Sequence, residues 1–137
     1  MKLVPTRRLD QSIQILMFLA SSEGGHSSTE SISAVTGIGP VAIRRLMQAL
    51  GRAELISSIS GPRGGYRLSC SPSDIDMRIV TEACEGPINP NFCVLNGISC
   101  GNVSHCALHL LWSTAQDGLG HTLARISLAD VIESSRR

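Results

Sequence analysis

Two helix signals separated by a short glycine turn constrain the fold of this chain more than any other feature. Ser27 and Glu30 have the Ser/Thr-x-x-Glu spacing of a capping box, which predicts that a helix starts there. This short helix is expected to bury Ile32 and Val35 and to stop at Gly37. The chain is therefore predicted to turn sharply after about two helical turns.

A second helix signal follows the turn at once. Pro40 stands where the first residue of a helix tolerates a missing N–H. The apolar residues recur at the i, i+3, i+4, i+7 spacing of one buried stripe: Ile43, Leu46, Met47 and Leu50. Four other residues fall on the opposite face: Val41, Arg44, Arg45 and Gln48. Two short helices joined by a tight turn, the second with an exposed basic face, form a helix-turn-helix pattern.

A β-hairpin is predicted directly after the second helix. Residues 55–59 are rich in β-branched side chains, and Tyr66 and Leu68 show the period-2 spacing of a strand. Residues 61–65, Gly-Pro-Arg-Gly-Gly, form the turn between the two strands. A hairpin with Arg63 near its tip, placed after a helix-turn-helix, predicts a winged helix. The alternative is a small α+β domain in which the hairpin is only structural.

The other helix signals complete a mainly α fold with one small hairpin. A helix is expected over residues 9–21, and another begins at residues 71–74. The latter is expected to bury Ile75, Ile79, Val80 and Ala83. A long helix after residue 106 carries an a/d-like stripe of two heptads: Leu108, Trp112, Ala115, Leu119, Thr122 and Ile126. Such a helix must pack on its own domain or on a second copy of the chain.

Three segments are predicted. Residues 1–86 form a winged helix-turn-helix DNA-binding domain, residues 87–106 a cysteine-bearing loop, and residues 107–137 a dimerisation helix and a C-terminal helix. Residues 1–70 hold eight Lys/Arg and four Asp/Glu, a balance of +4, whereas residues 71–137 hold four and seven, a balance of −3. The basic first half suits a polyanionic partner.

Three cysteines and a histidine gather at the end of the loop. They are Cys93, Cys100, Cys106 and His109. An odd total of five cysteines leaves one thiol over from any closed set of intrachain disulfides. The intervals lack the close cysteine pair that is usual for structural zinc, so they favour an iron–sulfur cluster. Zinc, a disulfide and free thiols are the alternatives. The two other cysteines, Cys70 and Cys84, are interpreted as small buried hydrophobes.

Several classes of protein are excluded by what the sequence lacks. No apolar stretch approaches the roughly 18 residues of a transmembrane helix. The longest apolar run near the N-terminus, residues 15–20, is shorter than the roughly 7–15 residues of a signal peptide, so we expect a cytoplasmic protein with no membrane partner. Phosphate-loop, H-E-x-x-H and G-x-S-x-G motifs are absent, which argues against an enzyme. His26 and His121 are interpreted as surface residues.

Residues 55–68, with the sequence LISSISGPRGGYRL, resemble the wing of the Rrf-type bacterial transcriptional regulators, the IscR/NsrR group of iron–sulfur regulators. The cysteine loop follows at the family's distance, and residues 106–112 and 127–133 resemble its C-terminal helices. The resemblance implies a homodimeric winged-helix repressor or activator that binds a palindromic operator in double-stranded DNA. Its long helix would cross to the partner subunit, and its cluster would sense redox state, nitric oxide or iron.

The DNA contacts are expected from the second helix and the wing. Arg44, Arg45 and Gln48 would read bases in the major groove, where arginine pairs with guanine and glutamine with adenine. Arg63 would enter the minor groove or contact phosphate. Val41 and Ser60 are the other two residues that we expect to contact DNA. Two of these positions differ from those members of the family that regulate iron–sulfur cluster assembly: Arg44 stands where they have an acidic residue, and Ser60 stands where they have the wing arginine.

The resemblance also offers two candidates for a fourth cluster ligand. His109 matches the family histidine and shares a helix face with Cys106. The alternative is the partner subunit's Asp10, which matches the aspartate that ligates the cluster in the nitric-oxide-sensing members of the family. We favour His109, which goes with a 2Fe–2S cluster, over Asp10, which would suggest 4Fe–4S. Two alternative functions are an iron–sulfur electron carrier or cluster-delivery protein, and a thiol-based regulator without a cluster.

Overall fold

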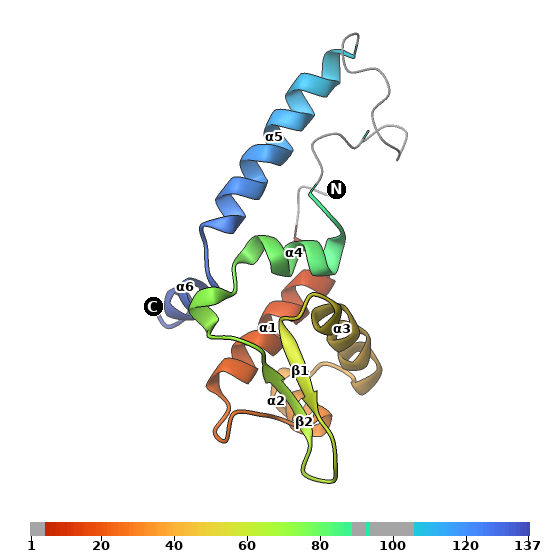
Figure 1. Ribbon diagram of the computed structural model, residues 1–137, viewed down its shortest axis with the longest axis vertical. Helices are drawn as coiled ribbons and strands as arrows, with labels where there is room; N and C mark the ends of the chain where they lie inside the picture. Colours follow the sequence, from red (N-terminus) through yellow and green to blue (C-terminus); the bar gives the residue numbers. More distant parts are fainter. Residues whose placement is uncertain (1–4, 89–92, 94–105) are drawn as a thin grey trace.

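The computed structural model describes residues 5–88, 93 and 106–137 (Figure 1). In these ranges the elements are α1 (Arg7–Ser21), α2 (Thr29–Thr36), α3 (Pro40–Arg52), β1 (Ile56–Ile59), β2 (Gly65–Leu68), the 3-10 turn η1 (Pro72–Asp74), α4 (Met77–Glu85), α5 (Ala107–Ala124) and α6 (Leu128–Ser135). The predicted mainly α fold with a winged helix-turn-helix is confirmed. None of the helices in these ranges has both the length and the apolar character needed to cross a membrane.

Helix α2 begins one residue later than predicted. Ser28, not Ser27, is the N-cap, and its side chain accepts a hydrogen bond from the Ser31 N–H at 3.2 Å. Ser27 is unavailable as a cap because its backbone pairs with Tyr66 of the wing, with Ser27 N–H donating to the Tyr66 carbonyl at 2.9 Å. The capping-box prediction therefore located the helix correctly but named the wrong serine.

The end of α2 and the start of α3 follow the sequence signals. Gly37 ends α2 in the left-handed conformation with φ 71°, a conformation that favours glycine, and Pro40 is the first residue of α3. Ile32 is fully buried as expected. The prediction that Val35 is buried is wrong, because its side chain is 67% exposed on the outer side of this short helix.

The core lies where α1, α2, α3 and α4 meet. The predicted stripe of α3 is buried in it, together with residues of the other helices and of the segments on either side of the hairpin: Ile15, Leu16, Leu19, Ile32, Ile43, Leu46, Met47, Leu50, Leu55, Ile75, Val80 and Leu128. Helix α3 also packs against β1. The core therefore fixes both the inner face of α3 and the base of the wing.

The wing is an antiparallel hairpin in which Ile56 pairs with Leu68 and Ile59 with Gly65. Gly65 passes very close to the α1–α2 turn. A Cβ at Gly65 would lie 2.6 Å from the carbonyl carbon of Ser27, which is closer than real Cβ atoms come to backbone. The wing and the turn can therefore pair only if this position has no side chain.

Gly65→Ala is expected to lower the free energy of unfolding by about 1–3 kcal/mol, the usual cost of forcing an atom into filled space. Gly51→Ala is the matched control, because a Cβ at Gly51 in α3 meets no atom within 4 Å. That control should raise stability by about 0.5–1 kcal/mol through the better helix propensity of alanine. Urea denaturation of both variants checks the pair. Equal stabilities would show that the close approach is not fixed in solution.

Helix α4 starts later than the predicted residues 71–74. Its N-cap is Asp76, whose carboxylate accepts from the Ile79 N–H at 2.9 Å. Ile75 and Val80 are buried as expected and Ala83 is half-buried, but Ile79 is 40% exposed, so its predicted burial is wrong. At the predicted start, Pro72–Asp74 form a separate 3-10 turn, η1, and not the first turn of α4.

The delayed start of α4 has a tertiary cause. The Ile75 carbonyl accepts from the Leu128 N–H at 2.8 Å, and the Met77 N–H donates to the Ile126 carbonyl at 2.8 Å. These bonds hold the backbone before α4 in an extended conformation, with Asp76 paired to Ser127. The start of α6 is thereby joined to the winged domain. Ser127 and Asp130 form a reciprocal capping box there, and these hydrogen bonds lower the pKa of Asp130.

The two cysteines outside the loop, Cys84 and Cys70, differ in their burial. Cys84 is buried as predicted, its thiol donates to the Ser12 hydroxyl at 3.1 Å, and burial raises the pKa of the thiol. The corresponding prediction for Cys70 is wrong, because Cys70 is exposed. It follows Ser69, whose N–H is bonded to the Leu55 carbonyl, and so lies just beyond the hairpin on the surface.

Candidate nucleic-acid interface and cysteine loop

The outer face of α3 carries the predicted DNA-contacting side chains. Val41, Arg44, Arg45 and Gln48 are all exposed, and Val41 is 61% exposed. The buried stripe holds the other face of α3 against the core, so the orientation of this outer face is fixed. In the described ranges no carboxylate forms an ion pair with either arginine. Two free guanidinium groups and an amide on one rigid helix face suit hydrogen bonding to base edges.

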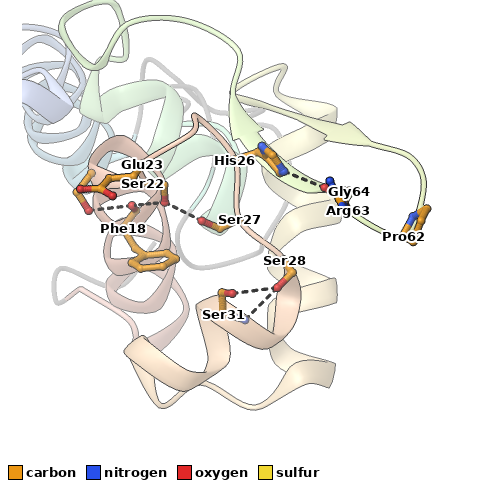
Figure 2. A pocket seen from close by; sticks show the side chains of 11 residues that line it. Phe18, Ser22, Glu23, His26, Ser27, Ser28, Ser31, Pro62, Arg63 and Gly64 are labelled. Carbon is orange, nitrogen blue, oxygen red and sulfur yellow. Dashed lines mark hydrogen bonds between the residues drawn. The ribbon is translucent and has the colours of Figure 1, made fainter.

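The wing brings a further cation to the same end of the molecule. Arg63 and Ser60 are exposed near the tip of the hairpin, at the end opposite the start of α5 (Figure 1). An open hollow of about 550 Å³ separates the wing tip from α1 and from the start of α2. Figure 2 shows its walls, which hold one carboxylate, one imidazole and five serines: Phe18, Ser21, Ser22, Glu23, His26, Ser27, Ser28, Ser31, Pro62, Arg63 and Gly64.

His26 is in contact with the wing, which the sequence did not indicate. Its ring is half-buried, and Nε2 lies 2.8 Å from the carbonyl oxygen of Arg63 (Figure 2). The two residues are 37 positions apart, so no local pattern could have paired them. The interpretation of His121 as a surface residue is confirmed, since it is exposed on α5 near Asp117.

The described part of the cysteine loop contains two of the three predicted ligands. Cys93 and Cys106 are half-buried and unpaired, and Cys100 lies outside the described residues. Cys106 is the N-cap residue of α5, and within the described residues its side chain makes no capping hydrogen bond. His109 lies half-buried one turn further along α5. Free thiols and an imidazole are a donor set that suits an iron–sulfur cluster.

The described residues of one chain do not bring a complete ligand set together. Among them no three of His, Cys, Asp and Glu are close enough to hold a metal ion. Asp10 is exposed in the first turn of α1, where its carboxylate accepts from the Gln14 amide at 2.9 Å. His109 therefore lies one turn from Cys106, but within the described ranges neither His109 nor Asp10 forms a group with both Cys93 and Cys106.

The chain enters the cysteine loop from an anchored position. The Ile88 N–H donates to Glu82 Oε1 at 3.0 Å, and Arg78 Nε donates to the same oxygen at 3.3 Å. The Arg78 guanidinium in turn lies against Gly120 of α5, where an added Cβ would come to 3.4 Å from the guanidinium carbon, an ordinary contact distance. Hydrogen bonds thus join the start of the loop to α4, and the Arg78 side chain brings α4 into contact with α5.

Helix α5 exposes an apolar surface at its start. Its C-terminal half packs on α4, whereas its N-terminal half projects from the rest of the chain (Figure 1). Leu110 is 75% exposed, Leu111 63% and Leu108 38%. The heptad positions Trp112 and Leu119 are only half-buried. The predicted apolar helix is present, and one copy of the chain does not cover it.

A helix-turn-helix whose second helix exposes basic residues beside a hairpin wing defines the winged-helix class of regulators. The profile of the Rrf2 family, described as an iron-dependent transcriptional regulator, matches residues 5–134. The chain belongs to the Rrf2 family of transcriptional regulators, as the resemblance of its wing indicated.

Individual relatives agree with this assignment. The HTH-type transcriptional regulator IscR of Escherichia coli (strain K12 / DH10B) is 30% identical over 114 residues, which are 83% of this chain and 70% of the relative. IscR of Aliivibrio salmonicida is 28% identical over 132 residues, 96% of this chain and 77% of the relative. The relatives are transcriptional regulators, a class of proteins that are generally not enzymes.

Solved structures show the same fold. The structure of CymR (YrzC), the global cysteine regulator of B. subtilis, aligns with a TM-score of 0.74 at 25% identity and covers 97% of this chain and 98% of its own. IscR of T. potens aligns with a TM-score of 0.71 at 25% identity, covering 97% of this chain and 88% of its own.

Proposed function

We propose that this Rrf2-family regulator acts in the cytoplasm as a homodimer on a palindromic DNA operator, and that an iron–sulfur cluster controls its affinity. The observation that carries the DNA part is the outer face of α3 beside the wing, where Arg44, Arg45 and Gln48 are exposed and, in the part of the chain that the structure describes, form no ion pairs. Two copies related by a two-fold axis would present these faces to half-sites about one helical turn, or a multiple, apart.

The roles of the α3 side chains can be separated by measuring affinity and salt dependence together. Removing a bidentate base contact, by Arg44→Ala or Gln48→Ala, should weaken operator binding by about 1–3 kcal/mol and leave binding to scrambled DNA unchanged. Arg63 is expected to contact phosphate. Arg63→Ala should therefore weaken binding to operator and to scrambled DNA alike, and should reduce the slope of log affinity against log salt concentration by about one. Arg125→Ala, at an exposed arginine beyond α5, is the control.

The same measurement tests the proposed function. Uniform weakening by all substitutions in α3 would mean that the helix contacts only the DNA backbone. An absence of any effect would mean that this face does not bind DNA.

The cluster is proposed to be held by Cys93, Cys100 and Cys106, with His109 as the fourth ligand. When bound, it would supply a redox-sensitive centre. Cys106 is the first residue before α5, so a change at its sulfur acts directly on the start of that helix. At the other end of the loop, Ile88 is bonded to Glu82, which pairs with the Arg78 that covers α5. Both ends of the loop can therefore shift α5 relative to α4, and with it the spacing of the two wings in a dimer.

His109→Ala is expected to change the visible spectrum of anaerobically purified protein and to hasten loss of the colour, whereas Asp10→Ala should alter neither. His121→Ala is the control on the same helix, because His121 is exposed near Asp117. Native mass spectrometry of the same samples counts the irons. An effect of Asp10→Ala alone, with four irons per subunit, would assign the fourth ligand to the partner subunit's Asp10.

A thiol-based regulator without a cluster is the second candidate. It is favoured by the free, half-buried thiols of Cys93 and Cys106 and by the structural similarity to CymR, the global cysteine regulator of B. subtilis. Protein that contains no iron after anaerobic purification, but changes its operator affinity on oxidation, would support this candidate over the cluster.

A further inference from the structure

The α1–α2 turn is joined to the wing by backbone pairing. The Ser27 N–H donates to the Tyr66 carbonyl at 2.9 Å, and the Tyr66 N–H donates to the Ser27 carbonyl at 2.8 Å. Ser27 thereby forms an isolated antiparallel bridge with β2. This pair fixes the tip end of β2, where Tyr66 lies opposite Ser58, but it is still three residues away from Arg63 in the turn.

His26 extends this attachment to the tip of the wing. Its Nε2 lies 2.8 Å from the Arg63 carbonyl oxygen, as Figure 2 shows. A carbonyl oxygen can only accept, so Nε2 carries the hydrogen and donates it. On the other side of the ring, Nδ1 lies 3.3 Å from the Gly24 carbonyl. The imidazole therefore spans the space between the turn and the tip.

The bond to His26 restricts a segment that has much conformational freedom. Arg63 lies between Pro62 and two glycines, and the Gly64 N–H closes the turn on the Gly61 carbonyl at 3.0 Å. The Arg63 side chain is exposed and makes no ion pair in the described ranges, including with Glu23, the carboxylate that lines the same hollow. Holding the backbone of Arg63 in place before DNA arrives reduces the entropy lost on binding.

We propose that His26 is a positioning residue for DNA binding, which holds the wing tip through the Arg63 carbonyl so that the Arg63 guanidinium meets the operator backbone or minor groove in a fixed place. The inference rests on the proposed function because the ligand of Arg63 is DNA. His26 itself touches the protein backbone, and its effect on DNA binding passes through Arg63.

The test is a mutant cycle measured by fluorescence anisotropy on a labelled palindromic duplex, selected by the wild-type protein from a randomised library. His26→Ala should weaken binding about five-fold, the effect of losing one net hydrogen bond. His26→Gln should restore most of the affinity, because its side-chain amide can donate to the same carbonyl. In an Arg63→Ala background, His26→Ala should cause no further loss.

Amide hydrogen exchange provides a readout that does not depend on DNA. His26→Ala should speed exchange of the Gly64 N–H, and His26→Gln should slow it again, while the core amides of α3 keep their wild-type rates. His121→Ala should match wild-type protein in both experiments. Unchanged exchange at Gly64 in His26→Ala would overturn the inference.

Other results in the DNA experiment would also overturn it. These are wild-type affinity in His26→Ala, or the same five-fold loss with and without Arg63. Failure of the proposed function looks different, because the wild-type protein would then bind palindromic and scrambled duplexes equally before any variant is compared. That result would overturn both the function and the role of His26.

Discussion

Leu110→Asp combined with Leu111→Asp is expected to convert a dimer into a monomer and to weaken operator binding by about 100-fold or more. The two side chains are 75% and 63% exposed in a single chain, on the part of α5 that projects from the winged domain. A second copy packed on this surface would bury them, and two carboxylates in their place would have to lose their hydration. A monomer would bind each half-site alone and lose the gain from simultaneous binding.

Analytical ultracentrifugation of the double variant checks the oligomeric state. Val35→Asp is the matched control, because Val35 is an equally exposed apolar residue, 67% exposed, on α2 rather than α5. It should leave the dimer intact. A double variant that still sediments as a dimer would place the dimer interface elsewhere on the molecule.

Cys106→Ala is expected to remove the iron–sulfur chromophore and to give operator affinity equal to that of cluster-free wild-type protein. Coupling between two sites in one protein is typically 5–150-fold, so the variant should differ from cluster-bearing wild type by a factor in that range. Cys93→Ala should behave in the same way. The affinities are measured anaerobically on the palindromic duplex, with the wild type in both states.

Cys70→Ala is the matched control for the loss of a thiol. Cys70 is exposed and lies just after the hairpin, outside the loop, so its removal should leave colour and affinity unchanged. If Cys93→Ala and Cys106→Ala bind every operator as the cluster-bearing wild type does, the proposed coupling between loop and DNA is wrong.

The sequence predicted those features that local chemistry determines. The buried stripe of α3 follows from its periodicity, and Gly37 and Pro40 mark the ends of two helices because each suits one backbone conformation. The exposed face of α3 followed from the same periodicity. The hairpin was predictable because Gly-Pro-Arg-Gly-Gly favours a turn between two short strands.

The errors in the burial of Val35, Ile79 and Cys70 concern side chains that local spacing assigned to the wrong face, whereas other differences occur where distant segments meet. Ser27 is not the cap of α2 because its backbone pairs with Tyr66, and the extended backbone before α4 is held by residues next to α6. His26 was interpreted as a surface residue because its partner, the Arg63 carbonyl, is a backbone group with no sequence signature. For the cysteines, sequence spacing identifies donors but not their geometry, and Cys100 lies outside the described residues.

Sequence-specific binding of a palindromic operator can be measured by comparing the affinity of the protein for two duplexes. Wild-type protein is titrated by fluorescence anisotropy on the selected palindrome and on a scrambled duplex of the same composition, over a range of salt concentrations. We expect the palindrome to be bound at least about 10³-fold more tightly, with a steep salt dependence for both duplexes. Equal affinity for the two duplexes at every salt concentration would contradict it.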